Sequence, residues 1–138
     1  MTRRLMLIVV AVLTMAAAAH AAPKKITVES MPPVVVKTTP LSGDTAVDPS
    51  LTQIKVTFSK RMQTKDMWSW VKLSDDTFPE ITGKSGYLKD AKTCVLPVKL
   101  KPDKTYAIWI NTGKNDAFRD MGGNSAVPYL LVFQTAKK

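Results

Sequence analysis

Short runs of alternating apolar and polar residues recur along this chain, and each run predicts a β-strand. The clearest is 54–58, where Ile54, Val56 and Phe58 alternate with polar residues. Successive side chains of a strand point to opposite faces, so these three share one face. Comparable runs predict about seven strands in all: 34–36, 54–58, 68–73, 78–82, 94–100, 106–111 and 127–135.

Turn-forming residues separate these runs, and no segment shows convincing helical periodicity. Residues 40–44 read Pro-Leu-Ser-Gly-Asp, and 113–124 form a long polar stretch. Many short strands separated by turns predict an all-β fold, either an immunoglobulin-like antiparallel β-sandwich or another small antiparallel fold. Pro97 lies inside one run and cannot donate a backbone hydrogen bond, so that strand should lie at a sheet edge or carry a local bulge.

The N-terminus has the order of a secretory signal peptide. Basic residues come first, an uncharged apolar run covers 5–19, and small residues continue to Ala21. This order predicts a signal peptide over 1–21. The apolar run is shorter than the roughly 18–20 residues of a membrane span. We therefore expect a flexible leader over 22–32, one domain over 33–138, no membrane span after cleavage, and a periplasmic or extracellular location.

The charge pattern is typical of a solvated surface. The chain has 20 basic and 11 acidic residues, and removal of the signal peptide leaves 18 basic residues and a net charge of +7. A positive charge is compatible with acidic partners. However, the lysines are spread along the chain without a run of five or six. We expect no nucleic-acid partner.

The residue inventory argues against catalysis. The only histidine is His20, which cleavage after Ala21 would remove, and with it the usual general base. Asp75 and Asp76 are adjacent, so they cannot face the same site from a strand. The only cysteine, Cys94, lies in an apolar run and should be a buried small hydrophobe. We expect no enzymatic activity and no cofactor.

A tyrosine motif favours the sandwich over other antiparallel folds. Leu100, Pro102 and Tyr106 stand in the pattern Leu-x-Pro-x-x-x-Tyr. In immunoglobulin-like sandwiches, a tyrosine near the start of the sixth strand hydrogen-bonds to the backbone just upstream. Proline fixes φ in the connecting turn. Tyr106 and Pro102 are therefore predicted to form a structural tyrosine corner.

The two ends of the domain carry a family resemblance. The opening has Pro40, Gly43 and Val47, then the strand 54–58 followed by Ser59 and Met62, and the close has Asp-Met-Gly-Gly-Asn at 120–124 and Phe-Gln-Thr at 133–135. In this order and spacing the chain resembles the bacterial immunoglobulin-like domains of the S-layer (SbsA) type over 34–136. The resemblance implies a secreted or cell-surface module with a structural or accessory role.

The aromatic residues are the best binding candidates. If 68–73 is a strand, Trp68 and Trp70 share a face, with Tyr87 nearby. In the run 106–111, Trp109 lies on the face opposite to that of Ile108 and Ile110. Exposed, Trp68, Trp70 and Tyr87 would form a platform for a protein or a polysaccharide of the cell envelope. The alternative is that both tryptophans are buried in the core.

The loop near the C-terminus has a structural and a metal-binding interpretation. Asp116, Asp120 and Asn124 could offer oxygen ligands to Ca²⁺, although the spacing is far from that of an EF-hand. We favour the structural interpretation, in which Asp120 and Asn124 hydrogen-bond the turn and Gly122 or Gly123 supplies a positive φ.

A copper-binding alternative depends on where the signal peptide is cleaved. Cleavage after Ala19 would leave His20 as the first residue, and its amine and imidazole together could hold Cu(II). The layout is then similar to that of small periplasmic copper-binding β-sandwich proteins. Methionines 31, 62, 67 and 121 could suggest Cu(I), but methionine is more often core filler.

The mass of the exported protein should separate these two possibilities. We expect the secreted chain to begin at Ala22 and to retain no metal when Cu(II) is added. Intact-mass spectrometry of the secreted protein, with and without Cu(II), is the measurement. A chain that begins at His20 and carries one copper ion would support the copper-binding alternative instead.

Overall fold

The computed structural model describes residues 18–138, so the predicted signal peptide lies mostly outside the described residues. This part of the chain contains strands and no helix, so no helix there is able to span a membrane. Its eight strands are β1 (Val35–Thr39), β2 (Gln53–Phe58), β3 (Trp70–Lys72), β4 (Glu80–Ile81), β5 (Gly86–Tyr87), β6 (Thr93–Lys99), β7 (Thr105–Ile110) and β8 (Tyr129–Gln134).

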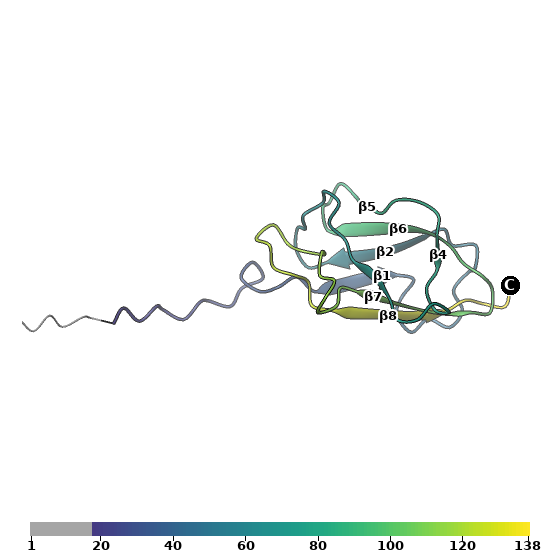
Figure 1. Cartoon of the computed structure of the whole chain (residues 1–138), viewed down its shortest axis with the longest axis horizontal. Coiled ribbons are helices and arrows are strands. Elements are labelled where there is room, and N and C mark those ends of the chain that lie inside the picture. Colours follow the sequence, from purple (N-terminus) through teal and green to yellow (C-terminus); the bar gives the residue numbers. More distant parts are fainter. Residues whose placement is uncertain (1–17) are drawn as a thin grey trace, which may run out of the picture.

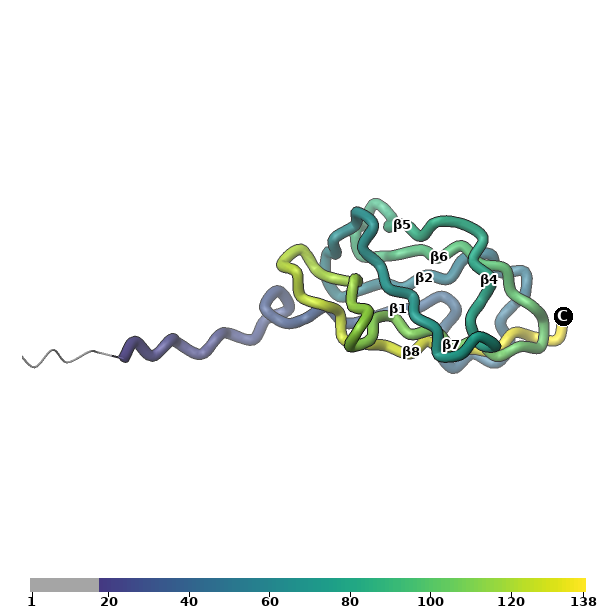
Figure 2. Tube along the Cα trace, in the orientation of Figure 1, coloured from purple at the N-terminus to yellow at the C-terminus, as the bar shows by residue number. Residues whose placement is uncertain are grey.

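The strands form two antiparallel sheets that pack face to face (Figures 1 and 2). One has the order β1-β2-β6-β4, with β5 also pairing with β6, and the other has the order β3-β7-β8. The predicted all-β immunoglobulin-like sandwich is confirmed. The additional strand is β5, which lies outside the seven predicted runs.

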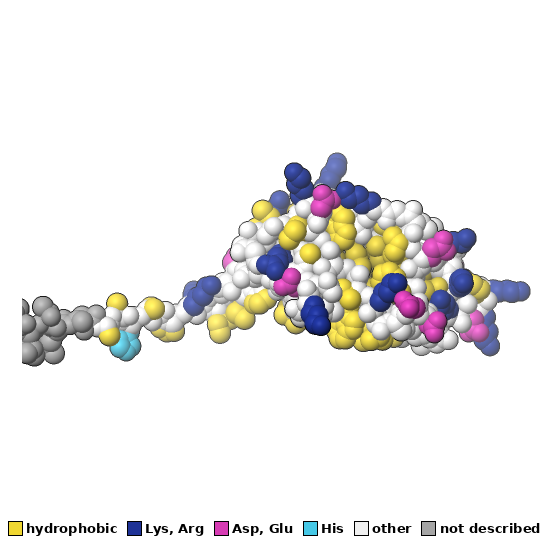
Figure 3. Space-filling model, in the orientation of Figure 1, with side chains coloured by type: hydrophobic (Ala, Val, Ile, Leu, Met, Phe, Trp, Pro, Cys, Tyr) yellow, Lys and Arg dark blue, Asp and Glu magenta, His cyan; other side chains and the backbone are white. Residues whose placement is uncertain are grey.

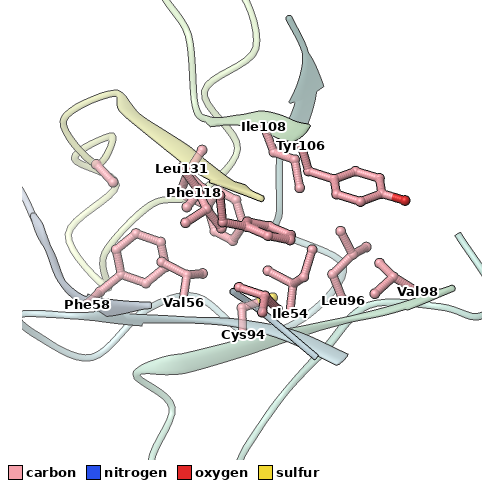
Figure 4. Packing of buried hydrophobic residues seen from close by; sticks show 14 of the residues in the cluster. Ile54, Val56, Phe58, Cys94, Leu96, Val98, Tyr106, Ile108, Phe118 and Leu131 are labelled. Atoms are coloured by element: carbon pink, nitrogen blue, oxygen red, sulfur yellow. The ribbon is translucent and has the colours of Figure 1, made fainter. Parts of the chain in front are cut away.

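The core is built from the inward-facing residues of both sheets, as the alternation predicts. Ile54, Val56 and Phe58 of β2 are buried, and Ile54 and Val56 lie opposite Leu96 and Cys94 of β6. The other sheet contributes residues 106, 108 and 110 of β7 and 131 and 133 of β8, all of them buried. Figure 4 shows side chains of both sheets meeting between them, among them Ile54, Ile108 and Leu131. Burial of this apolar surface is the main source of stability.

Pro97 lies on an interior strand of the sheet and not on an edge strand. The sheet accommodates proline there because the neighbouring strand is interrupted beside it. On one side β6 pairs with β2, and Pro97 lies opposite Gln53. On the other side β4 pairs with residues 98 and 99, and β5 with residues 94 and 95. Pro97 falls between the two, where its carbonyl accepts a hydrogen bond from the amide of Thr82 at 3.1 Å. The N–H that proline lacks would point into this interruption.

The long segment after β7 is folded onto the domain by one buried asparagine. Asn111 donates from Nδ2 to the carbonyls of Phe118 (2.9 Å) and Ala126 (3.1 Å), and its Oδ1 accepts from the amide of Phe118 (3.0 Å). These bonds hold the ring of Phe118 in the core, 5.1 Å from the ring of Phe58 between centroids. Phe118, on a stretch predicted as a polar loop, is thus one of the largest fully buried residues.

The strands β1 and β8 are linked by the segment between β1 and β2. The amide of Gly43 donates to Val132, and Val47 makes a parallel bridge to Thr135. This closes one side of the sandwich. On the other side, where β3 faces β4 and β5, no named strand joins the two sheets within residues 18–138.

The hydroxyl of Tyr106 binds the chain upstream of its own strand. It accepts a hydrogen bond from the amide of Lys101 at 2.8 Å, across the turn that contains Pro102. The ring is buried and stacks on Phe133 with 5.4 Å between centroids. This is the geometry of a tyrosine corner, and it fixes the connection between β6 and β7.

We predict that Tyr106→Phe lowers the free energy of unfolding by about 1 kcal/mol, the net value of one hydrogen bond. The matched control is Tyr129→Phe, because Tyr129 also packs on the core but makes no side-chain hydrogen bond with the described residues. Urea denaturation of the three proteins measures the difference. Equal stability of the two variants would contradict a role for the corner.

Candidate functional site

The main concave feature of the surface is a groove along the open side of the sandwich. It has a volume of about 620 Å³. Its lining comes from β3, from β4, from the segments that flank them and from the inner face of β6. The lining residues are Trp68, Ser69, Trp70, Val71, Lys72, Phe78, Ile81, Gly83, Lys84, Ser85, Leu96 and Asn115. Figure 3 shows hydrophobic side chains gathered in the middle of one face, with Lys and Arg around them.

The groove exists because the strands on this side are too short to cover the core. β3 has three residues and β4 and β5 have two each, against seven in β6. Leu96 of β6, which belongs to the core cluster, therefore lines the groove. Phe78 and Ile81 add apolar surface to the lining, and the side chain of Ile81 is exposed. The site is thus an opening in the hydrophobic core.

The two candidate tryptophans line this groove, but they do not form a flat exposed platform. Both are half-buried and pack against the core. Trp68 lies just before β3, with the ammonium of Lys84 5.8 Å from its ring centroid. The ring of Trp70 meets Phe118 edge to face, with 5.2 Å between centroids. Of the two predicted outcomes, exposure or full burial, the structure has an intermediate one.

Trp70 carries an unusual feature within the groove. Its Nε1 is buried and has no hydrogen-bond partner among the described residues. A buried N–H without a partner costs about 1–3 kcal/mol, so native structures seldom leave one. An acceptor supplied by a ligand would remove this cost.

Tyr87, the third candidate, does not line the groove. It lies in β5, packs against the core, and its hydroxyl donates to the carbonyl of Met67 at 3.3 Å. Burial of the phenol, and to a lesser extent the neighbouring Cys94, raises its pKa. Trp109 is also absent from the groove, because it lies in β7 opposite Val71 and Leu130 and outside the core cluster. The structure therefore brings together Trp68 and Trp70 only.

The charged residues that line the groove are both lysines. Lys72 pairs with Asp75 at 3.2 Å, and Lys84 pairs with Asp66 at 2.7 Å. All four side chains are more than half exposed. Exposed ion pairs contribute about 0–1 kcal/mol, so either lysine can exchange its partner at little cost.

The predicted turn residues form a compact cage around the carboxylate of Asp120. Its Oδ1 accepts from the amides of Gly122 (2.9 Å) and Asn124 (2.8 Å), and Oδ2 from Nδ2 of Asn124 (3.0 Å). Gly123 has φ of +83°, a conformation that glycine adopts without strain. The carboxylate is engaged by this turn and by one further residue.

That further residue is Lys60, which the sequence did not single out. Its Nζ lies 2.8 Å from Oδ2 of Asp120, and both side chains are buried. The same ammonium donates to the carbonyls of Glu29 (2.7 Å) and Met31 (3.1 Å). The end of the predicted leader is therefore held against the domain by hydrogen bonds from the ammonium of Lys60, which is itself paired with Asp120. In the sequence, Lys60 and Arg61 are two adjacent basic residues. Nothing there distinguishes Lys60, which is buried, from Arg61, which is exposed.

The described residues provide no metal site made of conventional ligands. No three His, Cys, Asp or Glu side chains come together within residues 18–138. Asp116 is engaged by Arg119 through two contacts of 2.9 Å and by Ser125 at 3.0 Å. Three of the methionines, 62, 67 and 121, line one hollow of about 280 Å³, but Arg61 and Lys65 line it too, and their positive charge disfavours a cation.

Cys94 and His20 lie in opposite surroundings, one buried and one exposed. Cys94 is buried, and burial raises the pKa of its thiol to about 12, so it stays protonated at neutral pH. The ring of His20 lies 3.1 Å from the carbonyl of Ala18 through Nδ1 and is exposed. Within residues 18–138, neither belongs to a group of three potential metal ligands, and the residue opposite Cys94 in β5 is Tyr87.

Comparison with known proteins agrees with this architecture. A sequence model of the bacterial Ig-like domain family matches residues 29–135, so the chain belongs to that family. A crystal structure of the S-layer protein rSbsC is similar, with a TM-score of 0.50 and 19% identity over 80% of this chain. A structure of surface layer protein SbsC, domains 1–6, gives a TM-score of 0.46 and 17% identity. This chain spans 14% of either structure. No curated protein matches it.

We predict that acid weakens the fold through Asp120. Burial opposes ionisation, but hydrogen bonds from Lys60 and Asn124 outweigh it and hold the pKa of Asp120 below its usual value. The carboxylate therefore contributes fully above the unfolded-state pKa of about 3.9, and its contribution is lost as the pH falls through the lower folded-state pKa. Asp120→Asn should remove this dependence.

The same substitution leaves Lys60 buried without its charge partner, and we expect it to cost about 3–5 kcal/mol at neutral pH. The control is Asp116→Asn, whose partner Arg119 is partly exposed, and we expect it to cost much less because exposed ion pairs contribute little. Urea denaturation between about pH 3 and about pH 7 measures the loss of stability in both variants. This range extends from below to above the unfolded-state carboxyl pKa of about 4. Similar losses in the two variants would show that burial of the ion pair is unimportant.

Proposed function

We propose that this protein is a secreted, non-catalytic module of the bacterial cell envelope that binds another envelope component through the groove. The observation that carries the proposal is the groove itself, an opening of the hydrophobic core lined by Trp68 and Trp70. Its volume of about 620 Å³ exceeds the roughly 400 Å³ of a second hollow, which is lined in part by Leu51 and Leu100.

Export is supported by the order of basic, apolar and small residues at the N-terminus. A structural role at the envelope is supported by membership of the bacterial Ig-like family and by a fold shared with a domain of an S-layer protein. The absence of a nucleophile placed beside a base in residues 18–138 supports a role other than catalysis.

A binding role is supported by what the groove exposes. Soluble proteins seldom leave aromatic and aliphatic side chains of the core accessible without a ligand or partner to cover them. Ligand sites are concave and mostly apolar, with a few polar groups that fix orientation. Here Phe78 and Leu96 supply the apolar surface, and Ser69 and Lys84 are among the polar groups. The copper-binding alternative rests on His20, and within residues 18–138 no group of three His, Cys, Asp or Glu side chains supports it.

We predict that Trp68→Ala weakens binding to isolated envelopes of the source organism by about tenfold or more, since truncation of a central tryptophan typically costs about 2 kcal/mol or more. The matched control is Trp109→Ala, because Trp109 is also half-buried but lies away from the groove. Cosedimentation measures binding, and circular dichroism checks folding. Retention of full binding by a folded Trp68→Ala protein would contradict the groove as the site.

A further inference from the structure

Assuming that the groove binds an envelope component, we propose that this component is an extended polypeptide segment with an acidic side chain. The segment adds as a strand to the free edge of β3. This inference deepens the proposed function and rests on it. Four features of the groove support it: the free backbone of β3, the free backbone of β4, the unpaired donor of Trp70, and the two lysines.

The register of β3 shows which of its backbone groups are free. The amide of Asn111 donates to the carbonyl of Ser69 at 3.1 Å, and Val71 lies opposite Trp109. In an antiparallel pair, backbone groups point alternately toward and away from the partner strand. Ser69 and Val71 therefore face β7, and the N–H and C=O groups of Trp70 and Lys72 face away. Within the described chain no strand pairs with that edge.

The opposite wall has the same property. The amide of Thr82 donates to Pro97 of β6 at 3.1 Å, and Ile81 lies opposite Val98. By the same alternation, the N–H and C=O of Ile81 point away from β6. The groove is thus bordered by unpaired backbone on both walls. A row of such groups is a template for another strand, and strand addition is a recurrent mode of peptide recognition.

The indole of Trp70 supplies an observation independent of the backbone. Its Nε1 is buried without an acceptor and belongs to a residue that lines the groove. A peptide strand offers a carbonyl at every residue, and one of these would satisfy this buried donor if binding turned the indole edge toward the groove, next to the edge of β3. Its alternate side chains would cover the apolar surfaces of Phe78 and Leu96.

The lysines determine the charge of the peptide. Lys72 lies opposite Ile108, whose side chain is in the core, so Lys72 projects toward the inner side of the sandwich and over the ring of Phe78 at 5.6 Å. An inward-pointing charge on an edge strand discourages indiscriminate strand pairing. A segment with Asp or Glu at this position compensates the charge, and its carboxylate replaces the exposed Asp75.

Sugar rings fit the groove less well than a peptide. Polysaccharide recognition by tryptophan needs an open ring face, but Lys84 lies over Trp68 and Phe118 meets Trp70. Backbone donors and acceptors spaced along two strand edges match a polypeptide repeat. Binding of a glycan in the groove is therefore the competing outcome that the experiment must be able to detect.

The test uses a displayed library of random short peptides selected on the full secreted protein. We expect enrichment of peptides with apolar residues at alternate positions and one Asp or Glu.

Three variants test how the selected peptide binds. Lys72→Pro removes an outward-facing N–H without removing a hydrogen bond to β7, and we expect it to weaken binding of the selected peptide at least about tenfold. Lys72→Gln, which keeps the N–H, should weaken binding less and remove the preference for the acidic residue. Trp70→Phe, which removes the indole donor together with part of the ring that packs on Phe118, should also weaken binding.

Amide hydrogen exchange gives a readout that does not depend on any variant. In the free protein, the amides of Trp70 and Lys72 should exchange faster than that of Val71, and the selected peptide should protect both. The inference is overturned if no peptide is enriched, if N-methylation of alternate peptide bonds leaves affinity unchanged, or if neutral or uronic-acid oligosaccharides bind the groove while these amides stay unprotected. Envelope binding that is lost in Trp68→Ala but intact in Lys72→Pro would retain the proposed function and reject strand addition.

Discussion

The hydrogen bonds of Asn111 hold together the part of the structure on which the groove depends. This buried side chain joins the end of β7 to Phe118 and Ala126, and its own backbone has φ of 62°. Asparagine tolerates this left-handed conformation better than most residues. The chain therefore turns away from the sheet at Asn111 and returns with Phe118 in the core. A residue without both a donor and an acceptor at this position could not satisfy the three bonds.

The groove follows from this arrangement. The amide of Asn111 binds the carbonyl of Ser69, and the hydroxyl of Ser69 accepts from the amide of Ala117 at 2.8 Å. The segment 68–72 is thus fixed against the loop of Phe118, whose ring supports Trp70. The side of β3 that faces β4 receives no comparable support, and the interruption at Pro97 keeps β4 and β5 short. Asn111, Ser69 and Phe118 thus fix one wall of the groove, and the interruption at Pro97 leaves the other sparsely covered.

Much of the fold could be predicted because it depends on local periodicity. Alternation in β2 and β7 identified strands and their buried faces, and the turn chemistry of Gly123 followed from its neighbours. Phe118 and Lys60 could not be predicted, because each is buried by contacts distant in sequence, with Asn111 and Asp120. The sequence indicated only part of the groove. Trp68 and Trp70 were identified, but the open edge of β3 depends on strand lengths that propensity does not define.

The parallel bridge between Val47 and Thr135 has a mechanical consequence. The two ends of the described chain emerge at opposite ends of the domain (Figure 1). Amides of Gly43, Val47, Gln134 and Ala136 make hydrogen bonds between segment 43–47 and the end of β8. A force that pulls the ends apart would load these bonds together, in shear. Such a domain would resist stretching along its long axis, a property that single-molecule extension measures directly.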